Sequence, residues 1–262
     1  MKSCNRIILK MVPVIIMVSV VAAGCSSDNR EAADRTATVS EEAEVPVNTL
    51  TQEEINEGWV LLFDGESTEG WRGYNSETFP EEGWVIEEDG SLRVVGGVRG
   101  GDIIFDEKFR DFRLSLEWKV SEGGNSGIFY LAQEIEDTPI WQSAPEMQIL
   151  DNEGHPDAAR GMEGNRKAGA LYDLLPAVPQ NSRPVGEWNR AEVLVYRGTV
   201  VHFQNGEQVV EFQLGSPAWE EMVANSKFAD LEYFGNYEPG FIGLQDHGDD
   251  IWFRNIKIRK IN

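Results

Sequence analysis

A strand that ends in acid, amide and imidazole groups carries the clearest signs of chemistry in this chain. The run Glu146-Met-Gln-Ile-Leu-Asp151 leads into a glycine-containing turn that holds His155. Because side chains alternate along a strand, Glu146, Gln148 and Leu150 lie on one face and the apolar Met147 and Ile149 on the other. Polar side chains planted beside an apolar face indicate a lined groove.

A second polar cluster, Gly243-Leu-Gln-Asp-His-Gly248, supplies another of the three histidines. Proton transfer near neutral pH needs groups that titrate there, and imidazole does. His155 and His247 both lie beside carboxylates in glycine-rich segments. His202 lies inside an expected strand, and we expect it to be structural or on the surface.

The first residues predict an export signal. Lys2, Arg6 and Lys10 accompany the apolar run Met11 to Ala23, which is too short to span a bilayer comfortably. The run ends in Ala-Ala-Gly-Cys25, which resembles a bacterial lipoprotein signal. We therefore expect residues 1–24 to be a signal peptide, Cys25 to be lipidated, and the protein to be anchored in the bacterial cell envelope, on its periplasmic or surface face. An ordinary cleaved signal and a weak membrane anchor are the alternatives.

The composition of the remaining residues predicts a tether and one domain, and their charge limits the classes of ligand. Residues 25–50 are polar and acidic and predict a disordered tether, whereas residues 51–262 are long enough for one domain. The formal net charge is −22, and removal of the three basic residues of the signal lowers it to −25. Such a surface repels nucleic acid and anionic lipid headgroups. A lipid anchor is then the expected membrane contact, and a neutral saccharide is the favoured ligand, although a saline habitat also explains the acidity.

Strand patterns dominate residues 51–262. Phe112 to Val120 alternates apolar and polar side chains through nine residues. A capping box at Thr51 to Glu54 predicts a short helix, and Ala218 to Phe228 predicts another. Many short strands with little helix predict an all-β jelly-roll sandwich of two antiparallel sheets. The further expected strands are Trp84–Glu88 with Ser91–Val95, Gly127–Leu131, Trp141–Leu150, Glu192–Tyr196, Val200–Gln204 with Glu207–Phe212, Gly240–Gln245 and Ile251–Ile258.

Two irregular features are candidates for ligand contact. The stretch from Asp151 to Ala168 has no clear regular pattern, and long irregular loops in compact domains are commonly functional. Trp141, Trp188 and Trp219 flank loops and could stack on sugar rings, with packing as the alternative role.

These motifs together resemble the 3-keto-disaccharide hydrolase domain family, over residues 50–262 and in order. The resemblance implies a concanavalin A-like lectin/glucanase sandwich and action on glycosides oxidised to a ketone at carbon 3. The motifs that carry it are Leu62-Phe-Asp-Gly65, Gly70-Trp71, Phe112–Val120, Gly124-Asn-Ser-Gly-Ile-Phe-Tyr130, Glu146–Asp151 with His155, Ala170-Leu-Tyr-Asp173, Gly186-Glu-Trp-Asn189, Gly243–Gly248 and Phe253-Arg-Asn-Ile256.

A ketone at carbon 3 opens an elimination route. It acidifies the hydrogen on carbon 2, so a base can form an enolate and the aglycone on carbon 1 can leave, with water adding later. We expect His155 or His247 to be the base. Glu146 would donate to the leaving oxygen or orient the base. The expected substrate-binding residues are Asn125, Gln148, Asp151, Gln245, Asp246, Tyr172 and Trp188.

Other functions fit the same residues. A divalent metal held by Glu146, Asp151, His155 and His247 could polarise the ketone as a Lewis acid. An ordinary glycosidase would use Glu146 and Asp151 as its pair of carboxylates. A lectin-like module at the cell surface would bind sugar without catalysis.

Overall fold

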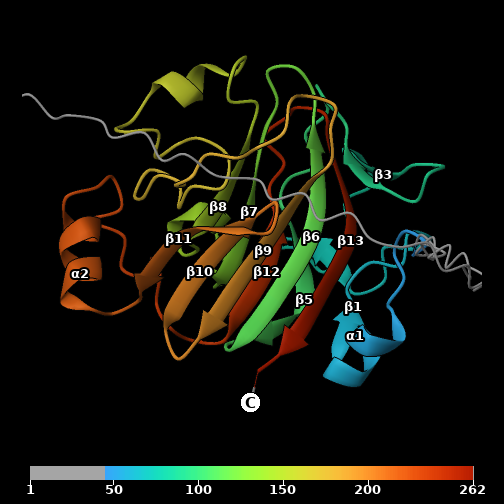
Figure 1. Cartoon of the computed structure of the whole chain (residues 1–262), viewed down its shortest axis with the longest axis horizontal. Coiled ribbons are helices and arrows are strands. Elements are labelled where there is room, and N and C mark those ends of the chain that lie inside the picture. The colour runs from blue at the N-terminus through green and yellow to red at the C-terminus, as the bar shows by residue number, and fades with distance from the viewer. Residues whose placement is uncertain (1–44, 262) are drawn as a thin grey trace, which may run out of the picture. The chain divides into compact units, whose positions relative to one another are not determined.

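The computed structural model describes residues 45–261, which form two antiparallel sheets around a shared apolar core (Figure 1). The eight-stranded sheet has the order β11-β10-β9-β6-β13-β4-β3, and β1 pairs with the C-terminal half of β13. The five-stranded sheet has the order β2-β5-β12-β7-β8. The expected jelly-roll sandwich is therefore confirmed.

The strand bounds are as follows. The eight-stranded sheet contains β1 (Trp59–Leu61), β3 (Trp84–Ile86), β4 (Leu92–Val94), β6 (Phe112–Val120), β9 (Asn189–Tyr196), β10 (Thr199–Gln204), β11 (Glu207–Gln213) and β13 (Ile251–Lys260). The five-stranded sheet contains β2 (Trp71–Gly73), β5 (Ile103–Phe109), β7 (Asn125–Ala132), β8 (Glu146–Leu150) and β12 (Gly240–Leu244).

In strand β6 the alternation of apolar and polar residues separates a face in the core from an outer face. Its side chains at Phe112, Leu114, Leu116 and Trp118 point into the sandwich and are at most 1% exposed. The charged side chains between them face outward and are partly exposed. Burying one apolar face of each sheet against the other is what holds the two layers together.

Helices are few, as expected, and lie at the margins. Helix α1 (Gln52–Glu57) begins with the predicted capping box, in which Thr51 and Glu54 satisfy each other's backbone N–H groups. Helix α2 (Pro217–Ala224) lies beside the β11 edge and is shorter than the predicted 218–228 (Figure 1). Two 3-10 turns, η1 (Ile140–Gln142) and η2 (Pro156–Ala159), lie in loops.

One expected strand was too long. Residues 141–150 were predicted to be a single strand, but the strand begins only at Glu146. The residues before it form η1, where the Ile140 carbonyl accepts from the N–H groups of Ser143 and Ala144. Pro145 has no N–H for a ladder, which separates the turn from the strand.

The folded domain begins before the predicted boundary at Thr51. Asn48 is buried, and it exchanges two hydrogen bonds with Asn255, of 2.6 and 2.7 Å. The predicted signal peptide, Cys25 and residues 25–44 of the tether lie outside the described residues. None of the helices in residues 45–261 has both the length and the apolar character needed to cross a membrane.

Candidate active site

A pocket of about 420 Å³ lies over β7 and β8, on the face of the five-stranded sheet that is turned away from the core. Met147 and Ile149 of β8 point into the core, so Glu146 and Gln148 point into this pocket. Its volume is in the range of small-molecule sites. The predicted site residues that line it are Asn125, Glu146, Gln148, His155, Tyr172, Gln245 and His247.

The strand register sets the order of groups along the pocket. Asn125 of β7 is paired with Leu150, Gly127 with Gln148, and Phe129 with Glu146. Asn125 and Glu146 therefore lie toward opposite ends of the β7–β8 pair, separated by four residues, or about 13 Å along the strands. Both predicted histidines follow strand ends on the Asn125 side.

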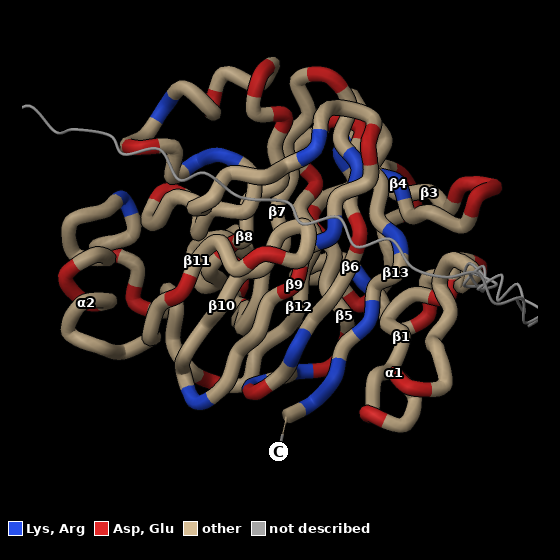
Figure 2. The backbone as a smooth tube through the Cα atoms, in the orientation of Figure 1, with Lys and Arg blue, Asp and Glu red and all other residues tan. Residues whose placement is uncertain are grey.

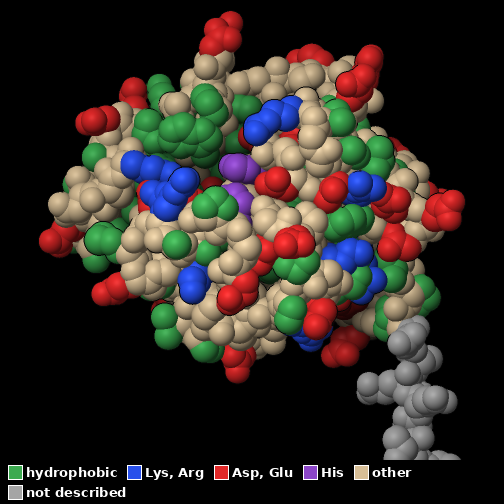
Figure 3. All heavy atoms as spheres, turned by 90° about the horizontal axis from the view of Figure 1, so that it is seen from above, with side chains coloured by type: hydrophobic (Ala, Val, Ile, Leu, Met, Phe, Trp, Pro, Cys, Tyr) green, Lys and Arg blue, Asp and Glu red, His purple; other side chains and the backbone are tan. Residues whose placement is uncertain are grey.

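The two histidines that reach this surface meet in a hollow (Figure 3). Their ring centroids are 5.9 Å apart and the rings are nearly perpendicular. Asp249 completes the group, because its Oδ2 lies 3.5 Å from His247 Nδ1 and accepts from the Asn125 N–H at 3.2 Å. One ligand atom from each of His155, His247 and Asp249 lies within 4.8 Å of the others.

The tautomer of His155 follows from its neighbours. The backbone N–H of Asp157, in the first turn of η2, donates to His155 Nδ1 at 3.1 Å. A neutral His155 therefore carries its proton on Nε2 and acts as a donor from that atom. Burial, and then the neighbouring His247, lower the pKa of His155, which favours this neutral form.

Glu146 is the buried acid of the pocket. Burial raises its pKa to about 8, and the charge of Lys227 opposes that rise. Gln148 can turn its amide nitrogen toward both the Ser126 carbonyl oxygen, at 2.9 Å, and Glu146 Oε1, at 3.0 Å. At neutral pH Glu146 is thus mainly a protonated carboxylic acid that can donate to a ligand.

A glycine makes room for that acid. Gly127 faces Gln148 across the ladder, and a Cβ added to it would lie 2.1 Å from Glu146 Oε1. Only a residue without a side chain lets the Glu146 carboxyl lie over β7. Two residues before Gly127 on β7, the buried Oδ1 of Asn125 has no hydrogen-bond partner among residues 45–261 and lines the pocket, so it is available to a ligand hydroxyl.

The remaining walls come from loops, and sequence reasoning assigned no role to most of their residues. Asp157 accepts from Arg166 Nη1 at 2.9 Å and from the Tyr172 hydroxyl at 3.0 Å. Arg160 and Lys227 add two further cations to the lining. Arg166 lies in the irregular stretch, residues 151–168, that the sequence marked as a candidate for ligand contact. Lys227 follows α2, and the only signal in the sequence around it is a group of aromatic residues.

Three predicted binding residues do not line this pocket. Asp151 accepts from the Gly123 N–H at 2.8 Å and lies in a neighbouring hollow. Asp246 accepts from the N–H groups of Gly101 and Gly248 and so shapes the turn that carries His247. Trp188 lies on the other sheet, 4.0 Å from the Arg254 guanidinium. In the first two cases the carboxylates bind backbone N–H groups of glycine-rich turns.

His202 is structural, as expected. It is fully buried between the sheets, where its Nε2 lies 2.8 Å from the Tyr130 hydroxyl and its Nδ1 3.1 Å from the Gly169 carbonyl oxygen. Burial lowers the pKa of His202 to about 4. Trp219 is also buried, stacked between Phe212 and Phe234, whereas Trp141 lines the pocket.

Comparison with known proteins identifies the family of this chain. Residues 58–259 match the model of the 3-keto-alpha-glucoside-1,2-lyase-like domain. The chain is 46% identical over 232 residues to a 3-keto-disaccharide hydrolase of Bacteroides thetaiotaomicron, with 79% of each chain covered.

Solved structures with a similar fold include two candidate glycosyl hydrolases. A candidate glycosyl hydrolase of Parabacteroides distasonis has a TM-score of 0.75 and 32% identity, and the match covers 82% of this chain and 100% of that one. A second candidate hydrolase of that organism has a TM-score of 0.58 and 30% identity, with coverage of 78% and 99%. The chain therefore belongs to the family of 3-keto-alpha-glucoside-1,2-lyase-like domains.

Proposed function

We propose that this protein cleaves the glycosidic bond of 3-keto-glycosides, including 3-keto-disaccharides, by elimination across carbons 1 and 2. The observation that carries the proposal is the convergence of two histidines and a protonated buried acid in one open pocket. Family membership supports the substrate class, because the relative from B. thetaiotaomicron is named for a 3-keto-disaccharide.

The two histidines divide the work of enolate formation. With Asp249 beside its Nδ1, His247 has Nε2 as the nitrogen that accepts a proton, and it acts as the base that removes the proton from carbon 2. The electron pair of the C–H bond moves to the ketone, and the oxygen on carbon 3 becomes an enolate. His155, held as an Nε2–H donor by the backbone of Asp157, stabilises that oxygen.

Glu146 completes the cleavage. As the enolate collapses, the bond between carbon 1 and the leaving oxygen breaks, and its electron pair stays on that oxygen. Protonated Glu146 donates its proton there, giving a free alcohol and an enone. Water then adds its hydroxyl group at carbon 1 and gives its remaining proton to Glu146, while His247 returns its proton to carbon 2, so the net reaction is a hydrolysis and both groups are restored.

The geometry disfavours an ordinary glycosidase. That mechanism needs two carboxyl groups on opposite sides of the scissile bond. Asp151, the expected partner of Glu146, lies outside the pocket. Asp157 is in the pocket, but its oxygens already accept from Arg166 and Tyr172.

A divalent metal is a second route to the same enolate. The donor atoms of His155, His247 and Asp249 are close enough together to share one ion, which would polarise the ketone. This trio differs from the predicted set, since Asp151 lies elsewhere and Glu146 is mainly protonated. Turnover abolished by a chelator and restored by added divalent ion would support this route, and turnover unchanged by the chelator would support direct proton transfer.

The deciding experiment compares substrates. Purified protein without its first 44 residues is given a 3-keto-disaccharide and the same disaccharide unoxidised, and released sugar is measured. Cleavage of the keto form alone is expected. Cleavage of both would support a conventional glycosidase, whereas binding of either without cleavage would support a lectin-like module. His247→Ala should reduce turnover by about 10²–10⁴ while keeping sugar binding.

Export and lipid anchoring at Cys25 also form part of the proposal. They are supported by the basic residues, the apolar run and the small residues that precede the cysteine. Full-length protein expressed in bacteria should incorporate a labelled fatty acid and fractionate with membranes. Cys25→Ser should abolish the labelling, and labelling that persists in this variant would contradict the anchor.

A further inference from the structure

We infer that the pocket has a separate aglycone subsite, formed by Trp141 and Lys227, at the end opposite the histidine pair. The inference rests on the proposed function and adds the direction in which the substrate lies. The keto sugar would lie beside the histidines, and the leaving portion would be a second hydroxyl-bearing ring held between an indole face and an ammonium group.

The order of groups along the strands gives this direction. The histidines lie on the Asn125 side, and Glu146 is four residues further along the β7–β8 pair. Ala144, just before β8, continues the lining beyond Glu146, and Trp141 lies three residues earlier in the chain. An acid that protonates the leaving oxygen must lie between the two parts of the substrate. Glu146 meets that condition, because the histidines lie on one side and Ala144 and Trp141 on the other. Lys227, which lies beside β8 over Tyr172, reaches this end through its contact with Trp141.

Trp141 presents an open ring at this end. Its side chain is 38% exposed, whereas the neighbouring pocket aromatics Phe228 and Phe234 are buried. A large aromatic side chain left open in a pocket keeps its apolar surface available, and a sugar ring has apolar C–H faces that can cover it. The buried rings instead support the wall from behind.

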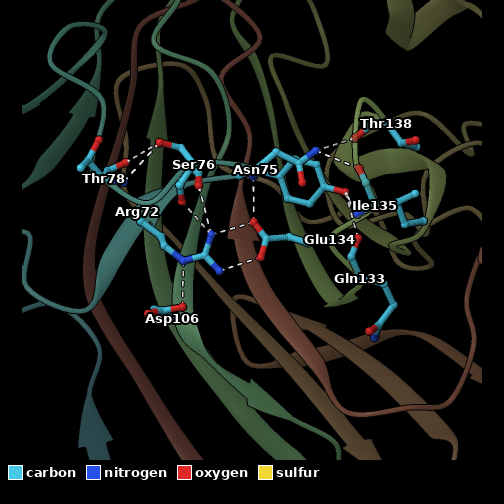
Figure 4. A network of polar contacts seen from close by, with 11 residues as sticks. Arg72, Asn75, Ser76, Thr78, Asp106, Gln133, Glu134, Ile135 and Thr138 are labelled. Carbon is cyan, nitrogen blue, oxygen red and sulfur yellow. Dashed lines mark hydrogen bonds and ion pairs between the residues drawn. The ribbon is translucent and has the colours of Figure 1, made fainter.

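The loop that carries Trp141 is braced from outside the pocket (Figure 4). Arg72 of β2 forms a bidentate pair with Glu134, with distances of 2.6 and 2.7 Å, and also binds Asp106. Asn75 binds the carbonyl oxygens of Ile135 and Thr138. These contacts fix the segment leading to η1, so Trp141 does not depend on ligand for its position.

Lys227 is held with its charge toward the pocket. Its Nζ lies 4.2 Å from the ring centroid of Tyr172, 5.0 Å from that of Phe228 and 5.9 Å from that of Trp141. Asp173 Oδ2, at 3.6 Å, balances the charge. An ammonium in an aromatic cage with one carboxylate still has N–H groups to donate, and the hydroxyl oxygens of an aglycone ring are suitable acceptors.

The Lys227 segment is fixed to the same end of the pocket. The Gly235 N–H donates to the Ser143 carbonyl oxygen, which joins the segment after α2 to the residues just before β8. Phe228 and Phe234 stack with centroids 4.0 Å apart, and Phe234 stacks on Trp219 of α2. The wall is therefore one packed unit, and a ligand that contacts Trp141 is within reach of Lys227.

The test uses two keto substrates that differ in their aglycone, a 3-keto-disaccharide and methyl 3-keto-glucoside. Trp141→Ala and Lys227→Met should each lower kcat/KM for the disaccharide by about tenfold, mainly through KM. At pH 7 or below, the methyl glycoside, which cannot reach this wall, should be cleaved at nearly the wild-type rate, because loss of the Lys227 charge raises the pKa of Glu146 further and leaves the acid protonated. Trp141→Phe keeps a ring and should recover part of the loss.

Matched controls come from the other sheet. Trp188→Ala and Lys119→Met remove the same side-chain types from a surface that does not line the pocket, and both should cleave the two substrates like wild type. Equal loss on both substrates in the Trp141 and Lys227 variants would overturn the inference and leave the proposed function standing, and so would no loss on either. A wild-type protein that cleaves neither keto substrate would overturn the proposed function, and this inference with it.

Discussion

Two of the regions in residues 45–261 where aromatic rings meet cations differ in the polar groups that they leave available to a ligand. On the outer face of the eight-stranded sheet, rings and cations alternate in the ladder Arg93, Trp252, Lys119, Trp188 and Arg254. The pocket over the five-stranded sheet combines Trp141, Tyr172 and three cations. Figure 2 shows acidic positions distributed over the whole described backbone, with basic positions among them.

The difference lies in how the groups are satisfied. In the ladder, Arg254 pairs with Glu117 at 2.6 Å, and Arg93 pairs with both Glu87 and Asp250 at 2.8 Å. In the pocket, Asn125 Oδ1 is buried without a partner and Glu146 is buried with a raised pKa. A structural surface uses its interactions internally, whereas a site keeps some unused for a ligand.

The variant Glu146→Gln tests most directly whether the pocket keeps an acid available to a ligand. It keeps the size and polarity of the side chain but cannot donate a proton as an acid. We expect kcat/KM on a 3-keto-disaccharide to fall by about 10²–10⁴. In wild type, kcat/KM should decline as the pH rises through about 8, because Glu146 loses its proton there. A pH–rate profile should show that alkaline decline in wild type but not in the variant.

Glu146→Gln should also change how the free energy of unfolding depends on pH. The folded-state pKa of Glu146, about 8, lies above its ordinary value of 4.5, so the folded protein binds more protons than the unfolded chain between these pH values. This contribution to stability is complete below about 4.5 and lost as the pH rises through about 8. Denaturant unfolding should show a flatter pH dependence across this window in Glu146→Gln. An unchanged profile would contradict the assignment of a buried protonated acid.

A second variant tests the space that the acid occupies. Gly127→Ala adds a methyl group 2.1 Å from Glu146 Oε1 without requiring a left-handed backbone, so the carboxyl group must move. A displacement of this size should lower kcat/KM by about 10–100-fold. The double variant with Glu146→Gln should be no slower than Glu146→Gln alone. Additive losses would mean that Gly127 matters for the fold rather than for the acid.

The sequence predicted part of the fold and part of the site. Alternation along β6 predicted which side chains face the core. In β8 it placed Met147 and Ile149 correctly, but all five residues are buried and Leu150 joins the core instead of sharing the pocket face. Glu146, His155 and His247 were named as the site, and the structure brings them into one pocket. Lys227 and Asp249 received no role, since the loop that covers a given strand depends on tertiary packing. Asp151 and Asp246 carry turn geometry, and their local sequence does not distinguish that task from ligand binding.

A remote change should have a smaller effect on the pocket. Arg72→Gln removes the bidentate pair with Glu134 and loosens the loop that carries Trp141. We expect KM for the disaccharide to rise by about fivefold, equivalent to ~1 kcal/mol, with kcat for methyl 3-keto-glucoside unchanged. Lys260→Gln breaks a more exposed ion pair, with Glu107, and should leave both values unchanged. A fall in kcat on both substrates would show that the network supports the whole site instead.

Substitutions in the ladder are expected to have the smallest effect on catalysis. Trp188→Ala removes the ring between Lys119 and Arg254, so the free energy of unfolding should fall by about 1–2 kcal/mol through lost packing and cation–π contact. The kcat/KM on either keto substrate should stay within about twofold of wild type, because no ladder residue lines the pocket. Thermal unfolding and steady-state kinetics on the same sample separate the two effects. A loss of turnover with unchanged stability would mean that this face takes part in binding substrate, and that satisfied ion pairs do not distinguish a structural surface from a site.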